Sequence, residues 1–316
     1  MNWRTRLSPA TFALLLLTAA AASADDIRVM TSGGFAAAYL ELAPAFEQAT
    51  GHRPVTDTTS IGTGASGIAA RLARGEAIDV VIASRQDIDR LIASGQIRAG
   101  SRVDLARSSI GMAVRRGAPK PDISTADALR RTLLEATSIA YSASVSGVYL
   151  STELFQQLGI ADRVLPKSRM IEGERVGAVV ARGDAEIGFQ QISELLPVPG
   201  LDFVGPLPQA VQRVTVFSAG IGANARNPDL AKRLIDFMAS PAAVPTIVKS
   251  ALEAIGACAG CDPFDEPNRS DYAGVAHRDA SGPDTPCREK RRVRKGRKEI
   301  PVFDFANFAT FALNAQ

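Results

Sequence analysis

The stretch that decides the fold is residues 27–51, IRVMTSGGFAAAYLELAPAFEQATG. Its first four residues, IRVM, are apolar except for Arg28, and this short run predicts a buried strand. Tyr39, Leu42 and Phe46 then recur at spacings of three and four, the periodicity of one helix face. Gly51 stands where a helix C-cap favours glycine. The loop TSGG at 31–34 joins the two, so backbone N–H groups, a hydroxyl and the positive end of a helix dipole point into one crevice, an arrangement that binds anions.

A second unit of this kind follows at residues 138–159, SIAYSASVSGVYLSTELFQQLG. The segments ARGEA (73–77) and ARGDA (181–185) each precede an apolar strand, and their separation nearly equals that of Ser32 and Ser142. The two matching offsets predict two lobes built on one plan, although they could also be a coincidence among common α/β turns.

The rest of the chain alternates between strand and helix patterns, which predicts an α/β fold. We expect two lobes, each a mixed, mostly parallel sheet flanked by helices. Lobe 1 comprises residues 25–108 and 208–256, and lobe 2 comprises residues 109–207. The expected strands are 53–58, 79–83, 108–115, 138–141, 186–190 and 211–219, and the expected helices are 68–73, 88–94, 126–136, 228–240 and 244–252.

Residues 1–24 have the pattern of a cleaved signal peptide. Arg4 and Arg6 precede an apolar run at 12–22, and Ala22-Ser23-Ala24 is a cleavage signature. We therefore expect export, most simply to a bacterial periplasm.

The last part of the chain, residues 257–316, loses periodicity and is interpreted as a disordered tail outside the main domain. It holds all three cysteines, Cys258, Cys261 and Cys287, and a basic run at 288–298. Two alternatives stay open: the cysteines with His277 form a metal site, or the basic run contacts an anionic surface.

The composition of the 316 residues is that of a globular protein, with 46% hydrophobic and 22% charged residues and a net charge of +3. Nothing in this charge balance indicates a nucleic-acid partner. The chain lacks a nucleophile elbow, a Walker loop and a paired-histidine metal motif. We therefore expect no catalytic residue, no metal, no cofactor and no enzymatic activity, with isomerase activity left open.

Four ordered segments between residues 25 and 256 resemble the extracellular solute-binding proteins of ABC importers, in particular their molybdate-binding-protein-like branch. They are TSGGFAAAYLELAPAFEQATGH, the hydroxyl-rich loop with IAARLARGEAIDVVIAS, YSASVSGVYLSTELFQQLGI and VGAVVARGDAEIGFQQISELLP. The resemblance implies a type II periplasmic binding fold, a two-lobed Venus flytrap. Such a monomer closes on a small anion and delivers it to a membrane permease.

The resemblance also implies a ligand site in the cleft between the lobes. The matching positions are Ser32, Gly33, Ser60, Thr63, Ser66, Ser144, Ser146, Val176 and Gln191. At Gln191 the sequence departs from molybdate binders, which typically have a tyrosine there, so the pocket differs in size and polarity.

The ligand class stays open between an oxyanion and a carboxylate, because hydroxyl and amide donors hold either one. A di- or tricarboxylate would also recruit an arginine, for which Arg85 and Arg175 are candidates. We expect the periplasmic binding component of an ABC transporter. The alternative is an exported isomerase on the same fold, similar to aconitate isomerase.

Overall fold

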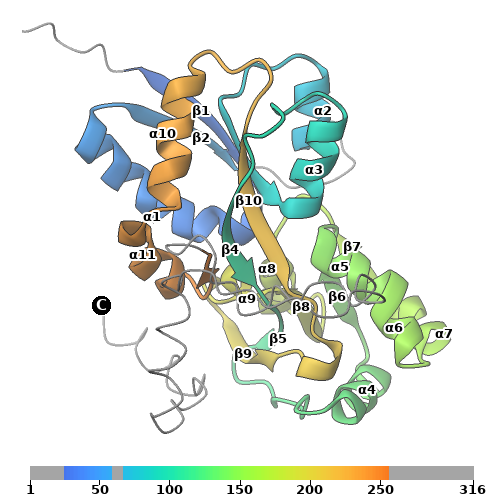
Figure 1. Ribbon diagram of the computed structural model, residues 1–316. Coiled ribbons are helices and arrows are strands. Elements are labelled where there is room, and N and C mark those ends of the chain that lie inside the picture. The colour runs from blue at the N-terminus through green and yellow to red at the C-terminus, as the bar shows by residue number, and fades with distance from the viewer. Residues whose placement is uncertain (1–24, 59–66, 256–316) are drawn as a thin grey trace, which may run out of the picture. The chain divides into compact units, whose positions relative to one another are not determined.

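The structure is a computed structural model that describes residues 25–58 and 67–255 (Figure 1). The chain divides into two compact units, Met1–Ala257 and Cys258–Gln316, and every described residue belongs to the first. The expected signal peptide and tail lie outside the described residues.

The first sheet has the strand order β11-β4-β10-β3-β1-β2. Strand β1 runs parallel to both of its neighbours, whereas β10 runs antiparallel between β3 and β4. Its strands are β1 (Asp26–Thr31), β2 (Arg53–Thr58), β3 (Val80–Ser84), β4 (Val103–Ser108), β10 (Thr215–Ile221) and β11 (Glu253–Ala254). Its helices are α1 (Gly33–Thr50), α2 (Ile68–Ala73), α3 (Arg85–Ala93), α10 (Pro228–Met238) and α11 (Val244–Lys249).

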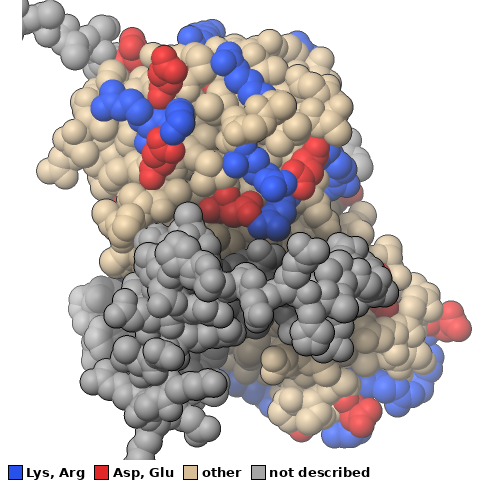
Figure 2. Space-filling model, in the orientation of Figure 1, with Lys and Arg blue, Asp and Glu red and all other residues tan. Residues whose placement is uncertain are grey.

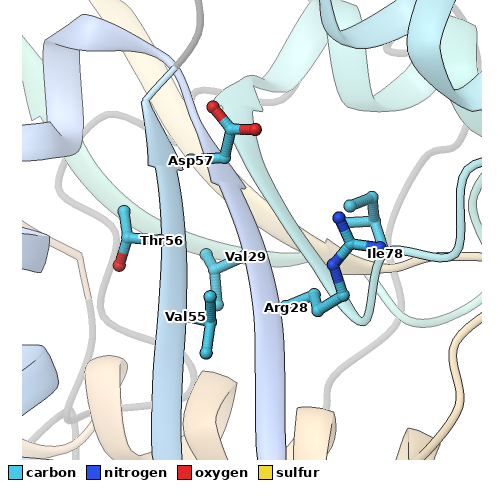
Figure 3. Close-up of a pocket in the computed structure, with 6 residues that line it drawn as sticks. All are labelled: Arg28, Val29, Val55, Thr56, Asp57 and Ile78. Carbon is cyan, nitrogen blue, oxygen red and sulfur yellow. The ribbon is translucent and has the colours of Figure 1, made fainter.

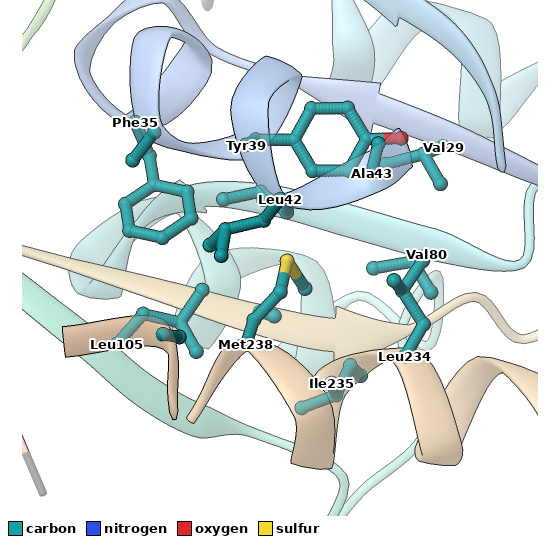
Figure 4. Close-up of a cluster of buried hydrophobic side chains, with 14 of the residues drawn as sticks. Val29, Phe35, Tyr39, Leu42, Ala43, Val80, Leu105, Leu234, Ile235 and Met238 are labelled. Atoms are coloured by element: carbon teal, nitrogen blue, oxygen red, sulfur yellow. The ribbon is translucent and has the colours of Figure 1, made fainter. Parts of the chain in front are cut away.

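Both faces of this sheet are covered, as the uninterrupted apolar run of β3 requires. Val80 and Ile82 belong to the core beneath α1 and α10, whereas Val81 and Ala83 belong to the core beneath α2 and α3. On the first face, side chains of α1 such as Leu42 point toward those of α10 such as Met238 across the cluster (Figure 4). Packing on both faces therefore holds the strands in place, and with them the loops at the strand ends.

The second sheet has the order β7-β6-β8-β5-β9, with β5 antiparallel to both of its neighbours. Its strands are β5 (Ile110–Arg115), β6 (Ile139–Ser142), β7 (Ser168–Ile171), β8 (Ile187–Gln191) and β9 (Leu201–Pro206). Its helices are α4 (Ala126–Glu135), α5 (Val145–Tyr149), α6 (Phe155–Gln157), α7 (Ala161–Val164), α8 (Val176–Arg182) and α9 (Ile192–Leu195), and a π-helical turn, Leu150–Leu154, joins α5 to α6.

The chain crosses between the sheets twice, from β4 to β5 and from β9 to β10. The side chain of Gln212 ties the two crossings together: its Oε1 accepts from the N–H of Ile110, and its Nε2 donates to the carbonyl of Ile110, both at 2.9 Å. The pairing directions put the carboxyl ends of β1, β3 and β4 at the crossing, together with those of β6, β8 and β9. Ligands of open α/β sheets bind at such ends.

The predicted α/β class with two mixed sheets is confirmed. The expected strand at 108–115 is wrong in extent, because β4 ends at Ser108 and β5 begins at Ile110. Strand β4 is not predicted, because its sequence, VDLARS, mixes charged with apolar residues. It lies second in the sheet, next to the short edge strand β11. The expected strand at 211–219 begins only at Thr215, since a 3₁₀ turn occupies Gln209–Val211. Within the described ranges, no helix is long and apolar enough to cross a membrane.

Candidate functional site

Ser32 connects β1 to α1 as the helix N-cap, with an extended backbone. Its N–H donates to the carbonyl of Ile82 at 2.9 Å, which fixes the residue between β1 and β3. Its Oγ is buried, at 7% exposure for the residue, and has no hydrogen-bond partner among the described residues. The first turn of the 18-residue helix carries no acidic side chain. This crevice thus holds an unused hydroxyl at a positive helix end, as the sequence predicted.

Neither Gly33 nor Gly34 has a positive φ, so backbone conformation does not require glycine at these positions. Neighbouring side chains that pack closely against them do. A Cβ at Gly33 would lie 2.0 Å from Oε1 of Glu194, and one at Gly34 would lie 2.0 Å from the ring of Phe217. The carbonyl of Gly34 also accepts from Oγ of Ser193 at 2.7 Å. The first turn of α1 therefore touches α9, which follows β8 of the second sheet.

Glu194 is a residue of this site that the sequence analysis did not predict. Its Oε1 accepts from Nε2 of Gln190 at 3.0 Å, and Oε1 of Gln190 accepts from the N–H of Val176 at 3.1 Å. Burial raises the pKa of Glu194 to about 7, against the opposing effects of the Arg175 charge and the Gln190 hydrogen bond. A carboxyl that titrates near neutral pH is suited to proton transfer.

The sequence held one signal for this residue: Glu194 stands among apolar residues immediately after a strand that ends at the crossing. Two other glutamates, Glu172 and Glu174, lie in the segment between β7 and α8. Both are exposed in the structure, and Glu174 pairs with Arg182.

Gln191 lies where the chain crosses between the sheets. Its Nε2 donates to Oγ1 of Thr215 at 2.9 Å, while its Oε1 is buried without a partner among the described residues. Ser108, which pairs with Thr215 in the sheet, has an equally unpartnered Oγ. A buried polar atom without a partner costs about 1–3 kcal/mol. Two such atoms close together indicate that a bound ligand or water supplies the missing hydrogen bonds here.

The second Ser/Gly unit carries three hydroxyls that bond to one another. Oγ of Ser142 lies 2.7 Å from that of Ser144 and 3.0 Å from that of Ser146, and the last two are 3.2 Å apart. Gly147 makes this turn possible, since a Cβ there would lie 1.6 Å from the carbonyl oxygen of Ser142. The structure thus groups the predicted residues Ser144 and Ser146.

A cavity of about 160 Å³ opens between α3 of the first sheet and α5 of the second. It is lined by the start of α3, by α5 and by the crossing segment: Ser84, Arg85, Gln86, Val145, Arg213, Val214, Thr215 and Val216. Arg85 pairs with Asp104. The guanidinium of Arg213 lies 4.4 Å from the ring centre of Tyr149 and pairs with Glu153. Two cations therefore border this cavity, of which sequence reasoning named only Arg85.

A second cavity, of about 120 Å³, lies over β1 and β2 (Figure 3). It is lined by Arg28, Val29, Val55, Thr56, Asp57 and Ile78. Its lining residues from β1 and β2 lie in the middle of these strands, and none of the six belongs to the candidate site. On the face drawn in Figure 2, acidic and basic side chains lie beside one another and form no patch of one sign.

The remaining predicted residues divide into two groups. Val176 begins α8, but its N–H is already engaged by Gln190, and Arg175 is the exposed residue before it. Ser60, Thr63 and Ser66 lie outside the described residues. Among the described residues, no group of three or more His, Cys, Asp or Glu side chains is placed to hold a metal ion. The ligand-binding role of all these positions stays a prediction.

Residues 27–251 match the family model described as bacterial extracellular solute-binding protein. The chain belongs to this family. It is also similar to the molybdate-binding protein ModA of Azotobacter vinelandii, with 25% identity over 242 residues, 73% of this chain and 91% of that protein. The resemblance found in the sequence is thereby confirmed.

Two solved structures share the fold. The periplasmic molybdate-binding protein of Azotobacter vinelandii gives a TM-score of 0.57 at 21% identity, covering 73% of this chain and 100% of that one. A substrate-binding protein of an ABC transporter from Agrobacterium tumefaciens gives 0.58 at 15% identity, covering 74% and 81%.

A further relative corrects one expectation. The chain is 46% identical over 239 residues, 75% of its length, to a Pseudomonas protein named aconitate isomerase, of which the match covers 91%. Because that relative is an enzyme, the expectation that this chain has no enzymatic activity is wrong. The sequence lacked a familiar catalytic motif, and Glu194 becomes visible as a tuned carboxyl only after folding.

Proposed function

We propose that the protein is an exported, monomeric isomerase that interconverts cis- and trans-aconitate or a closely related unsaturated tricarboxylate. The observation that carries the proposal is the 46% identity to a protein named aconitate isomerase across 91% of its length. Export to the periplasm is supported by membership of an extracellular solute-binding family and by the leader pattern of residues 1–24.

The chemistry of the cleft supports a carboxylate ligand. Arg85 and Arg213 border the cavity from α3 and from the crossing segment. Guanidinium groups suit carboxylates because they donate in a planar fork. Each hydrogen bond to a charged group contributes about 1.5–3 kcal/mol, so the hydroxyls of Ser32 and of the second Ser/Gly unit add to the same anion site.

The isomerisation requires only proton transfer. Rotation about the carbon–carbon double bond becomes possible when a proton leaves the neighbouring methylene and the double bond shifts. A proton added at the other end of the allylic system completes the reaction. Atoms and electrons balance without an oxidant, a reductant or a cofactor, so binding groups and one acid–base group suffice.

The test is direct conversion. Purified protein is incubated separately with cis-aconitate and trans-aconitate, and the other isomer is followed by chromatography against a protein-free blank. We expect both reactions to approach the same equilibrium ratio. Conversion no faster than in the blank, at saturating substrate between pH 6 and 8, would contradict the proposal.

A second candidate function is capture of a small anion for an ABC permease. It is favoured by the family match and by the 25% identity to a molybdate-binding protein. Thermal unfolding distinguishes the candidates, because a ligand bound at a hundredfold excess over Kd stabilises the protein by about 2.7 kcal/mol. Stabilisation by molybdate but not by aconitate would favour capture.

A further inference from the structure

We propose that Glu194 is the group that removes and returns the proton in the isomerisation, a step that rests on the proposed function. The inference starts from its position. The carboxyl belongs to α9, which directly follows the carboxyl end of β8, and its Oε1 fills the space beside Gly33 at the start of α1. It therefore lies between the carboxyl ends of the two sheets, where a ligand of this fold binds.

The surroundings of Glu194 hold its carboxyl in one orientation. Nε2 of Gln190 donates to Oε1 at 3.0 Å, and the other end of the same amide is fixed by the N–H of Val176 at 3.1 Å. On the neighbouring residue, Ser193, the hydroxyl bonds to Gly34 at 2.7 Å. The carboxyl is thus positioned by bonds within its own lobe and by contact with the other, as a proton-transferring group must be.

The groups beside Glu194 can hold the charge that develops on the substrate. When the carboxylate takes a methylene proton, the C–H electron pair forms the new double bond. The original π pair spreads onto the far carbon and the adjoining carboxylate. The start of α1 and the unpartnered hydroxyl of Ser32 supply donors beside that region. Return of the proton to the far carbon regenerates the Glu194 carboxylate.

The electrostatic environment agrees with this assignment. Arg175, the residue before α8, is the charged group that acts on Glu194, and the first turn of α1 adds no acidic side chain. Burial outweighs Arg175 and raises the pKa of Glu194 to about 7. A carboxylate with this proton affinity is a stronger base than one in water, and it is available at neutral pH.

The experiment compares the full-length wild type with Glu194→Gln, Glu194→Asp and a matched control, Glu135→Gln. Glu135 is an exposed glutamate at the end of α4, outside the site. Rates of conversion of cis-aconitate are measured from pH 5 to 9. Binding of trans-aconitate is measured separately by calorimetry.

We expect Glu194→Gln to lower kcat by about 100-fold or more, the usual contribution of a general base, while the calorimetric Kd changes little. The wild-type kcat/KM should rise with pH through a limb near neutrality, and this limb should disappear in Glu194→Gln. Glu194→Asp should keep a limb at a shifted pH with reduced kcat. Glu135→Gln should match the wild type throughout.

Failure of the inference and failure of the proposed function give different results. If the wild type converts aconitate and Glu194→Gln stays within tenfold of its kcat, the inference is overturned and the function stands. If the wild type converts neither isomer, both are overturned. Should Glu194→Gln not unfold cooperatively, Glu194→Asp decides: wild-type kcat and an unshifted pH limb would overturn the inference.

Discussion

The two Ser/Gly units follow one plan in sequence but differ in how their hydroxyls are used. After β1, Ser32 caps an unbroken helix of 18 residues, and its Oγ has no partner among the described residues. At the end of β6, the hydroxyls of Ser142, Ser144 and Ser146 bond to one another, and α5, which contains Ser146, gives way to a π-helical turn after five residues. The first unit offers a free donor, whereas the second must exchange an existing bond for a ligand.

The glycines of the two units differ as well. Gly33 makes room for a side chain from the other lobe, Glu194. Gly147 makes room for the backbone of its own loop, the carbonyl oxygen of Ser142. The first unit is shaped by contact across the cleft and the second by its own turn. Substitutions in the first unit should therefore affect mainly binding and catalysis, and substitutions in the second mainly stability.

The largest effect is expected in the second unit. Gly147→Ala places a methyl group 1.6 Å from a carbonyl oxygen that cannot rotate away. The forced backbone shift should destabilise the protein by about 3 kcal/mol, the upper range for overpacking. Chemical denaturation measures this. The control is Gly205→Ala in β9, where the nearest atom, in Ile123, would be 3.9 Å away. Equal stability of the two variants would show that the loop can rearrange.

The next effect concerns the carboxyl that contacts the first unit. In the folded protein the pKa of Glu194 is raised from 4.5 to about 7, by burial against the opposing charge of Arg175. Its contribution to stability is therefore fully present below pH 4.5 and is lost as the pH rises through 7. Relative to Glu194→Gln, the wild type should lose about 3 kcal/mol of unfolding free energy between pH 4.5 and 8. If the unfolding free energies of the two proteins change in parallel over this pH range, the pKa of Glu194 is not raised by burial.

Ser32→Ala tests the free donor of the first unit. Loss of one hydrogen bond to a charged ligand should weaken aconitate binding by about 1.5–3 kcal/mol, roughly 10- to 100-fold in Kd. Stability without ligand should stay unchanged or rise slightly, because the hydroxyl has no partner among the described residues. Calorimetric titration and thermal unfolding of the same samples measure both. Weaker binding accompanied by an equal loss of stability would assign Ser32 a structural role.

Ser144→Ala should have the smallest effect. Its hydroxyl already bonds to its neighbours, and the bond between Ser142 and Ser146 at 3.0 Å survives the change. To bind a ligand, the Ser144 hydroxyl must give up a bond to a neighbouring serine, so its net contribution to the binding free energy is only about 1 kcal/mol. The same titration measures it. A loss as large as that of Ser32→Ala would show that the two units donate equally and would remove the distinction between them.

Much of the scaffold could be predicted because periodicity and turn chemistry are local. The unit around Ser32, the stop at Gly51 and the helix expected at 228–240 follow from apolar spacing and capping chemistry, and the structure has them, the last as α10. Strand β4 could not be predicted, since a strand next to the edge, paired on its outer side with only two residues of β11, need not be apolar.

The site was less predictable because its chemistry depends on tertiary contacts. The sequence shows serines after strands, but it cannot show that those around Ser142 bond to one another while the Ser32 hydroxyl has no partner among the described residues. Glu194 looks like an ordinary glutamate until folding places it against Gly33 and removes its water. Arg213 reads as a surface charge until the crossing segment carries it over Tyr149.

The contact between Gly33 and Glu194 links mechanics to proton affinity. Gly33 begins α1, which packs on the first sheet, and Glu194 lies in α9, which follows β8 of the second. Any parting of the sheets that admits water therefore returns the carboxyl toward its ordinary, lower pKa. By reciprocity, protonation of Glu194 stabilises the state in which the sheets meet, and ionisation favours their separation. The proton then acts as an effector of closure as well as a reactant.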